Sequence, residues 1–176
     1  MAGISRADAP ASVPFMKLLI LLDIDGVLNP VARAAGPGGE PELVLSETRI
    51  ALVRRLAALG RIAWVSTWPA EQRAGLERQL QLPLEPLRVP LSGSLSESDA
   101  ATPKLRPVSR WLKKMELLGE AEWDAVVWID DVLGPDAREW AHQYNQPVLL
   151  ERPSPAQGLT EVHVVAVEVF VDGDGG

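Results

Sequence analysis

Asp23 and Asp25 follow directly on residues 18–22, an apolar run that predicts a strand buried on both faces, as in a parallel sheet. Because one residue separates the two aspartates, both side chains leave an extended backbone on the same face. A cation between the carboxylates, or a proton on one of them, relieves their repulsion, and Mg²⁺ favours a few carboxylates completed by phosphate and water. Gly26 permits a sharp turn at this point. The alternative is that Asp25 and Gly26 form an ordinary turn after a core strand.

Ser66 and Thr67 end a second apolar run, residues 62–65. A hydroxyl group at the end of a strand can donate a hydrogen bond to a phosphoryl oxygen, as can the N–H groups of the turn that follows. The alternative is a helix cap, a role that Pro69 at the start of the next predicted helix also supports. The two roles are compatible, so the pair is a candidate for binding a phosphate.

Asp130 and Asp131 end a third apolar run, residues 125–129, and Lys104 opens a predicted helix after Pro103. If the strand geometry persists, the two aspartates project to opposite faces, so that one reaches a metal while the other orients water or the backbone. The helix dipole disfavours a lysine at a helix start, which makes the placement of Lys104 informative; an ordinary surface lysine is the alternative. If the strands are parallel, all these groups lie around one crevice at the carboxyl ends of the strands.

The order of these motifs resembles that of the haloacid dehalogenase-like (HAD) phosphohydrolase superfamily. More narrowly, residues 23–30, 64–68, 104–105 and 128–131 are similar to the HAD domains of multidomain bacterial RNA-repair proteins. The resemblance covers roughly residues 17–151. It implies an α/β fold, a HAD-like Rossmannoid three-layer sandwich around a central parallel sheet.

The resemblance also implies roles for four residues in phosphoryl transfer. Asp23 would attack phosphorus and form an aspartyl-phosphate, while Asp25 would protonate the leaving oxygen and later activate the water that releases phosphate. Ser66 and Lys104 would hold the phosphoryl oxygens whose charge must be stabilised during transfer. Because Asp25 suits a leaving oxygen that needs a proton, the residues favour phosphate esters over the substrates of the dehalogenase members.

The cofactor that the resemblance implies is Mg²⁺. Its ligands would be Asp23, the backbone carbonyl of Asp25 and Asp131, with Asp130 nearby. By resemblance, the second aspartate of the acidic pair contacts the metal, which favours Asp131. Without the ion, a carboxylate nucleophile would repel the anionic phosphate that it attacks.

Further candidates for substrate binding are Gly26, Thr67, Trp68 and Arg33. Arg33 lies in a loop rich in glycine and proline, residues 30–41, which the resemblance implies is a flap over the site. Arg33 could reach a phosphate there, or it could be a solvated loop charge. Trp68 could stack on a base, or it could pack beneath the flap.

Charge and composition limit the classes of partner. The 176 residues carry a formal charge of −7 and no cysteine. The acidic balance argues against a broad basic face for long nucleic acids, but not against a substrate with one terminal phosphate. The lack of cysteine excludes disulfides and thiolate metal sites and fits a cytoplasmic location, and no apolar run is long enough to span a membrane. We expect a flexible arm at 1–15, a single domain at 16–170 and a disordered tail at 171–176.

The remaining pattern predicts helices and strands that alternate around these motifs. Helices are expected at residues 46–59, 69–80, 104–115 and 137–145, and strands at 62–65, 87–90, 125–129 and 147–150. Residues 160–170 are rich in valine, which favours a strand, whereas Thr160 as a cap and the valine spacing allow a helix. The resemblance implies a helix for this segment, and we predict a helix.

The intervals between the motifs set the size of the site. About forty residues separate the first motif from the second, and the second from Lys104, which leaves no room for a large cap domain. We therefore expect an open site, and the leading hypothesis is a Mg²⁺-dependent phosphohydrolase for the phosphates of nucleotides or nucleic-acid ends. One alternative is a catalytically idle binding or regulatory module with the HAD fold. Another is a small-molecule phosphatase that is capped by dimerisation, and the oligomeric state stays open.

Overall fold

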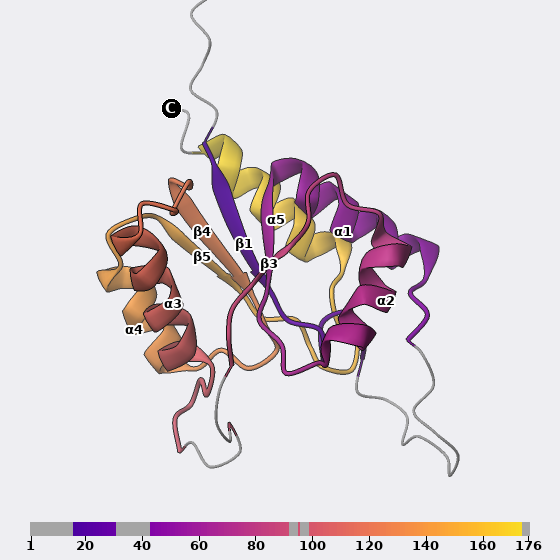
Figure 1. Ribbon diagram of the computed structural model, residues 1–176, viewed down its shortest axis with the longest axis horizontal. Coiled ribbons are helices and arrows are strands. Elements are labelled where there is room, and N and C mark those ends of the chain that lie inside the picture. Colours follow the sequence, from indigo (N-terminus) through magenta and orange to yellow (C-terminus); the bar gives the residue numbers. More distant parts are fainter. Residues whose placement is uncertain (1–15, 31–42, 92–94, 96–98, 174–176) are drawn as a thin grey trace, which may run out of the picture.

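A parallel β-sheet of five strands crosses the centre of the molecule (Figure 1). The computed structural model describes residues 16–30, 43–91, 95 and 99–173, and all five strands lie within these ranges. Its strands are β1 (Leu18–Leu22), β2 (Gly60–Trp64), β3 (Leu87–Arg88), β4 (Ala125–Ile129) and β5 (Val148–Glu151). Their order in the sheet is β3-β2-β1-β4-β5, which places β1 in the middle.

In the described part of the chain, five helices cover the two faces of this sheet. They are α1 (Glu47–Leu59), α2 (Ala70–Leu80), α3 (Leu105–Leu117), α4 (Pro135–Gln143) and α5 (Glu161–Gly173). One face carries α1, α2 and α5, and the other carries α3 and α4 (Figure 1). The chain therefore forms the three-layer α/β sandwich with a central parallel sheet that the sequence predicts.

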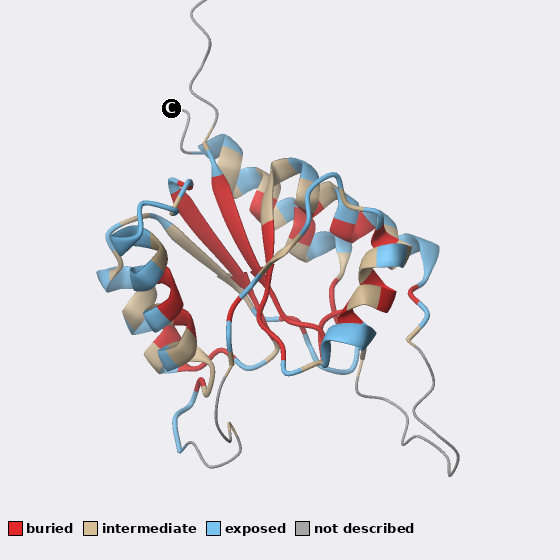
Figure 2. Ribbon diagram, viewed as in Figure 1, coloured by how far each residue is buried: buried red, intermediate tan, exposed pale blue. Residues whose placement is uncertain are grey.

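The side chains of β1 alternate between the two helical layers. Leu18, Ile20 and Leu22 pack in the core beneath α1, α2 and α5, whereas Leu19 and Leu21 pack in the core beneath α3 and α4. All five residues are buried, and Figure 2 shows the central strands in red. A strand that is covered on both faces needs an apolar residue at every position, which explains the uninterrupted run in the sequence.

Helix α1 passes directly into β2. The helix begins as predicted at Ser46, whose Oγ accepts a hydrogen bond from Arg49 N at 3.2 Å. A Cβ atom at Gly60 would lie 2.4 Å from the carbonyl oxygen of Leu18. A glycine at this position therefore allows β2 to start beside β1 without a connecting loop.

Residues 160–170 fall mostly in α5, so the predicted helix is confirmed despite the valine content. Val164 and Val167 face the core, and Arg55 of α1 forms ion pairs of 2.6 and 2.7 Å with two glutamates of α5. Strand propensity depends on burial within a sheet, and here packing against α1 decides the conformation.

Other boundaries shift slightly from the prediction. Strand β3 is limited to two residues, and α4 begins at Pro135, because proline suits the first turn of a helix. The predicted arm, most of the loop that contains Arg33, and the last three residues of the predicted tail lie outside the described residues. The domain limits of 16 and 170 stay a prediction. Within the described ranges, no helix is long and apolar enough to cross a membrane.

Candidate active site

The predicted site residues lie where neighbouring parallel strands end. Leu22 of β1 is in register with Trp64 of β2 and with Ile129 of β4. Asp23 directly follows β1, and Asp130 directly follows β4. Asp23 N donates a hydrogen bond of 3.1 Å to the carbonyl oxygen of Ile129. The register therefore brings residues more than a hundred positions apart to the same level of the sheet.

Lys104 joins the loops that follow three strands. Its Nζ lies 2.8 Å from Asp23 Oδ1 and 3.0 Å from Asp130 Oδ2, and it donates a hydrogen bond of 3.1 Å to the carbonyl oxygen of Val65. Only 17% of the lysine side chain is exposed. Lys104 is therefore not the free surface lysine that was the alternative reading of its position.

Asp131 joins Asp23 and Asp130 in a cluster of three carboxylates. One oxygen from each lies within 4.8 Å of the other two. The expectation that Asp130 and Asp131 project to opposite faces assumed that the strand continues, but β4 ends at Ile129, so this condition is not met. All donors in the cluster are carboxylate oxygens, which suits Mg²⁺.

Gly26 leaves the space in which the Asp131 carboxylate lies. A Cβ atom at Gly26 would be 2.3 Å from Asp131 Oδ2, and the backbone of Gly26 has a φ of 76°. Both the lack of a side chain and the positive φ call for glycine here. The role that the structure shows for Gly26 is thus to admit Asp131 to the cluster.

Burial makes the negative charge of this cluster costly. Burial, followed by the charge of Asp130, raises the pKa of Asp23 to about 8, against the lowering effect of Lys104. Burial likewise raises the pKa of Asp130. Burial by itself lowers the pKa of Lys104, but the charges of Asp130 and Asp23 outweigh it and the pKa is raised. Three carboxylates outnumber one ammonium group, so a divalent cation held by Asp23, Asp130 and Asp131 would balance the site.

Asp25 has a different environment from Asp23. It is exposed, and its Oδ1 accepts a hydrogen bond of 3.3 Å from Asn29 Nδ2. The expectation that both side chains share one face assumed an extended backbone, but β1 ends at Leu22 and a turn closed by Gly26 N and the Asn29 carbonyl follows. Asp25 is not part of the three-carboxylate cluster of the described residues. Its predicted roles as acid and base, and as a ligand through its carbonyl, stay predictions.

Ser66 lies beside the lysine contact at the end of β2. Its side chain is nearly buried, and its Oγ accepts a hydrogen bond of 3.1 Å from Trp68 N. As an acceptor in this bond, the hydroxyl keeps its own hydrogen for a phosphoryl oxygen. Thr67 is exposed, and Trp68 is half-buried against the core beneath α1, α2 and α5. Arg33, the remaining substrate-binding candidate, lies outside the described residues.

Thr102 and Asp136 connect the loop that carries Lys104 to the start of α4. Thr102 N and Oγ1 donate to the two oxygens of Asp136 at 3.0 and 2.7 Å, and Thr102 Oγ1 accepts from Gly134 N at 2.7 Å. Asp136 also accepts a hydrogen bond of 2.9 Å from Ala137 N, at the start of α4. No local pattern in the sequence indicated a role for Thr102, because its partners are more than thirty residues away.

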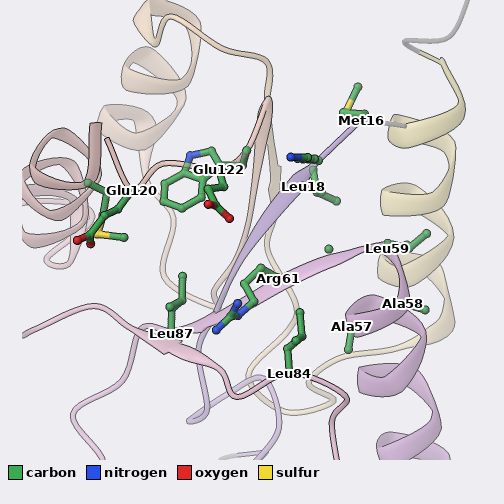
Figure 3. A pocket seen from close by; sticks show the side chains of 14 residues that line it. Met16, Leu18, Ala57, Ala58, Leu59, Arg61, Leu84, Leu87, Glu120 and Glu122 are labelled. Atoms are coloured by element: carbon green, nitrogen blue, oxygen red, sulfur yellow. The ribbon is translucent and has the colours of Figure 1, made fainter. Parts of the chain in front are cut away.

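A cavity of about 590 Å³ lies at the opposite, amino end of the sheet (Figure 3). Residues that begin β1, β2 and β3 line it, including Leu18, Arg61 and Leu87. None of the predicted site residues lines it, so the candidate site is the cluster of Lys104 and three carboxylates at the carboxyl ends of the strands and not this cavity.

Comparison with known proteins identifies the family of this chain. The family described as the HAD domain in Swiss Army Knife RNA repair proteins matches residues 19–164, which include every predicted site residue. No match was found among the curated proteins or among the solved structures. A match over most of the chain shows the family: this chain belongs to the HAD domains of Swiss Army Knife RNA repair proteins.

Proposed function

We propose that this protein is a Mg²⁺-dependent phosphomonoester hydrolase in which Asp23 is the nucleophile. The observation that carries the proposal is the contact of Lys104 Nζ with Asp23 and Asp130, beside the third carboxylate of Asp131. Membership of a HAD family supports phosphohydrolase chemistry in general. Mg²⁺ bound by the three carboxylates would neutralise charge on the phosphate.

The hydrogen bonds of Asp23 leave one of its oxygens for the attack. Oδ1 accepts from Ile24 N at 2.8 Å and contacts Lys104, so Oδ2 is the oxygen that these contacts do not occupy. The proposed first step forms a bond from Asp23 to phosphorus and breaks the ester bond, and Asp25 gives its proton to the leaving oxygen. In the second step water attacks phosphorus, Asp25 takes a proton from the water, and inorganic phosphate leaves Asp23.

Lys104 and Ser66 are suited to the charge that develops on the phosphoryl oxygens. The ammonium group is held by carboxylates and by the Val65 carbonyl, so its position is fixed before substrate binds. Donors that are already in place need no reorganisation when the transition state forms. We propose that both groups bind the oxygens of the transferred phosphoryl group.

The test is hydrolysis of an aryl phosphate with and without Mg²⁺, for the wild type and for Asp23→Asn. We expect release that depends on Mg²⁺ and that falls by at least about a thousandfold in the variant, since the nucleophile is lost. Asp172→Asn, an exposed change on α5, is the matched control and should keep wild-type activity. Equal activity in Asp23→Asn, or no release by the wild type with Mg²⁺, would contradict the proposal.

We propose further that the natural substrates are phosphates at nucleotides or nucleic-acid ends. The description of the family, which names RNA repair proteins, supports this, as does the lack of a cap domain among the described residues. A screen of phosphorylated metabolites beside 5′- and 3′-phosphorylated oligonucleotides, with the mass in solution measured in parallel, tests it. A preference for metabolites together with a dimeric mass would favour the small-molecule phosphatase instead.

A further inference from the structure

Arg73 is a buried cation at the end of α2 that lies nearest the candidate site. It shares the sheet-facing side of the helix with Leu76 and Leu80, and only 6% of the residue is exposed. Side chains on a helix lean toward its N-terminus, and α2 begins three residues after Thr67. The guanidinium group is therefore directed toward the carboxyl ends of the strands.

Arg73 forms no ion pair with an acidic side chain among the described residues. Its Nε is buried without a hydrogen-bond partner, and none of the ion pairs in the described part of the chain includes it. Glu77, one turn further along α2, attracts Arg73, but its Oε1 accepts a hydrogen bond of 3.0 Å from Trp64 Nε1. Buried charges in proteins are ordinarily paired, because an unpaired one loses its hydration without compensation. The position of Arg73 is therefore costly unless an anion binds there.

Arg88 adds a second positive charge beside Arg73. Leu87 and Val89 belong to the core beneath α3 and α4, so Arg88, which lies between them, faces the α2 side of the sheet. Burial, and then the charge of Arg88, lower the pKa of Arg73. Two neighbouring cations that form no ion pair within the described residues are suited to bind an anion such as phosphate.

The register of the sheet places this pair close to the site. Arg88 is in register with Trp64, and Trp64 with Leu22, the residue before Asp23. Arg88 is thus two strand spacings, roughly 10 Å, from the strand that delivers Asp23. No side chain caps the N-terminus of α2, and the dipole of a helix favours anions at that end.

We propose that Arg73 and Arg88 form an anion subsite that binds a second phosphate group of the substrate, next to the phosphate that is hydrolysed. This inference rests on the proposed function and narrows its substrate class to phosphomonoesters that carry a neighbouring phosphate. The end of a nucleic-acid strand and a nucleoside bisphosphate both have this chemistry. A local pair of arginines, rather than a broad basic face, is compatible with a net charge of −7.

The kinetic test compares substrates with one and two phosphate groups. In Arg73→Gln and in Arg88→Gln, we expect the KM for 3′- and 5′-phosphorylated dinucleotides to rise about tenfold, as for the loss of a charge-assisted hydrogen bond. The kcat/KM for an aryl phosphate should stay within about twofold of the wild type, because that substrate does not reach the subsite. Arg78→Gln, an exposed change at the far end of the same helix, is the matched control and should alter neither.

A nucleoside 3′,5′-bisphosphate separates the two sources of the second phosphate. If its KM depends on Arg73 and Arg88 as the KM of the dinucleotides does, the subsite recognises the second phosphate group alone. If only the dinucleotides show this dependence, the subsite recognises a phosphate within a nucleic-acid strand. An unchanged KM for all of these substrates in both variants would overturn the proposal. So would an equal loss with the aryl phosphate, which would make Arg73 a support of the catalytic site.

Binding without turnover separates this proposal from the proposed function. In the Asp23→Asn background, fluorescence anisotropy of a labelled 3′-phosphorylated oligonucleotide should show a Kd that rises about tenfold on Arg73→Gln. If binding depends on Arg73 but the wild type hydrolyses no substrate, the anion subsite is supported and the proposed phosphatase activity is contradicted. If the wild type hydrolyses its substrate normally but binding is unchanged by Arg73→Gln, the phosphatase activity is supported and the subsite is contradicted.

Thermal unfolding gives a further test of the subsite. We expect a thermal midpoint for Arg73→Gln that is not lower than that of the wild type, because a buried charge without an ion pair is removed. A marked drop in the midpoint would count against the subsite.

Discussion

Gly26 determines whether the carboxylate of Asp131 can join the candidate metal site. It contributes no ligand, but its missing side chain provides the space for the carboxylate of Asp131. A larger residue at position 26 would have to displace Asp131, and the cluster with Asp23 and Asp130 would open. The affinity of this candidate site for a metal would therefore depend on a residue that is not one of the ligands.

We predict that Gly26→Ala raises the Mg²⁺ concentration needed for half-maximal activity by about tenfold, because the new methyl group displaces one of the ligands. Gly119→Ala is the matched control. Gly119 also has a positive φ, 70°, but a Cβ atom there would meet nothing within 4 Å, so this change causes the backbone strain alone. A magnesium titration of aryl phosphate hydrolysis measures both variants. Equal shifts in the two would show that strain, and not the displacement of Asp131, is responsible.

The ionisation of Asp23 predicts how the stability of the metal-free protein depends on pH. Burial, and then the charge of Asp130, raise the pKa of Asp23 to about 8, whereas an aspartate in an unfolded chain titrates near 4. The folded state favours the protonated carboxyl group of Asp23. Below about pH 4 this carboxyl therefore does not lower the free energy of unfolding, and it lowers it increasingly as the pH rises from about 4 to about 8. Asparagine removes this effect, because it stays neutral at every pH.

We therefore predict that Asp23→Asn melts roughly 5 °C above the metal-free wild type at pH 8 and close to it at pH 4. Asp25→Asn, which changes an exposed carboxyl, should show no such pH-dependent difference. Thermal unfolding in the presence of a chelator measures the effect. A constant difference between Asp23→Asn and the wild type across this range would contradict the assignment.

At the scale of elements, the site depends on how α3 and α4 begin. Lys104 precedes the first residue of α3, and Thr102, two residues earlier, is bonded to Asp136 in the first turn of α4. The hydroxyl of Thr102 both donates to Asp136 and accepts from Gly134 N. These bonds fix the loop of Lys104 against the loop that follows the acidic pair.

We predict that Thr102→Val, which keeps the shape but removes the hydroxyl, lowers kcat for an aryl phosphate about tenfold and leaves KM nearly unchanged. The lysine is then less well placed for the transition state, whereas the substrate still binds. Thr102→Ser retains the hydroxyl and should restore most of the activity. If valine and serine at position 102 behave alike, the hydroxyl has no part in positioning Lys104.

The elements themselves were largely predictable from the sequence, because apolar runs and caps are local signals. Residues 18–22 and 125–129 are the strands that were predicted, and Ser46 caps the helix that was predicted to start there. The conformation just past each strand was not predictable. The backbone leaves the extended form after Leu22 and Ile129, so the faces inferred for the acids from an extended strand do not apply.

At the scale of the whole molecule, the order of the motifs predicted the sheet and the family, whereas contacts between distant segments could not be inferred. The bonds of Thr102 join residues more than thirty positions apart, and the unpaired charge of Arg73 is visible only after α2 is packed on the sheet. The amino end of the sheet, with its cavity, lies away from the predicted chemistry. One end of the sandwich therefore holds the candidate catalytic residues.

The most direct test of the account is to identify the residue that carries the phosphoryl group during turnover. The full chain is mixed with Mg²⁺ and an aryl phosphate, quenched with acid and reduced with borohydride, which converts an acyl phosphate of aspartate to homoserine. Peptide mass spectrometry then locates the change. We expect homoserine at position 23 and at no other position in the wild type, and no homoserine in Asp23→Asn. Modification at another residue, or turnover by the wild type without modification at position 23, would contradict the account.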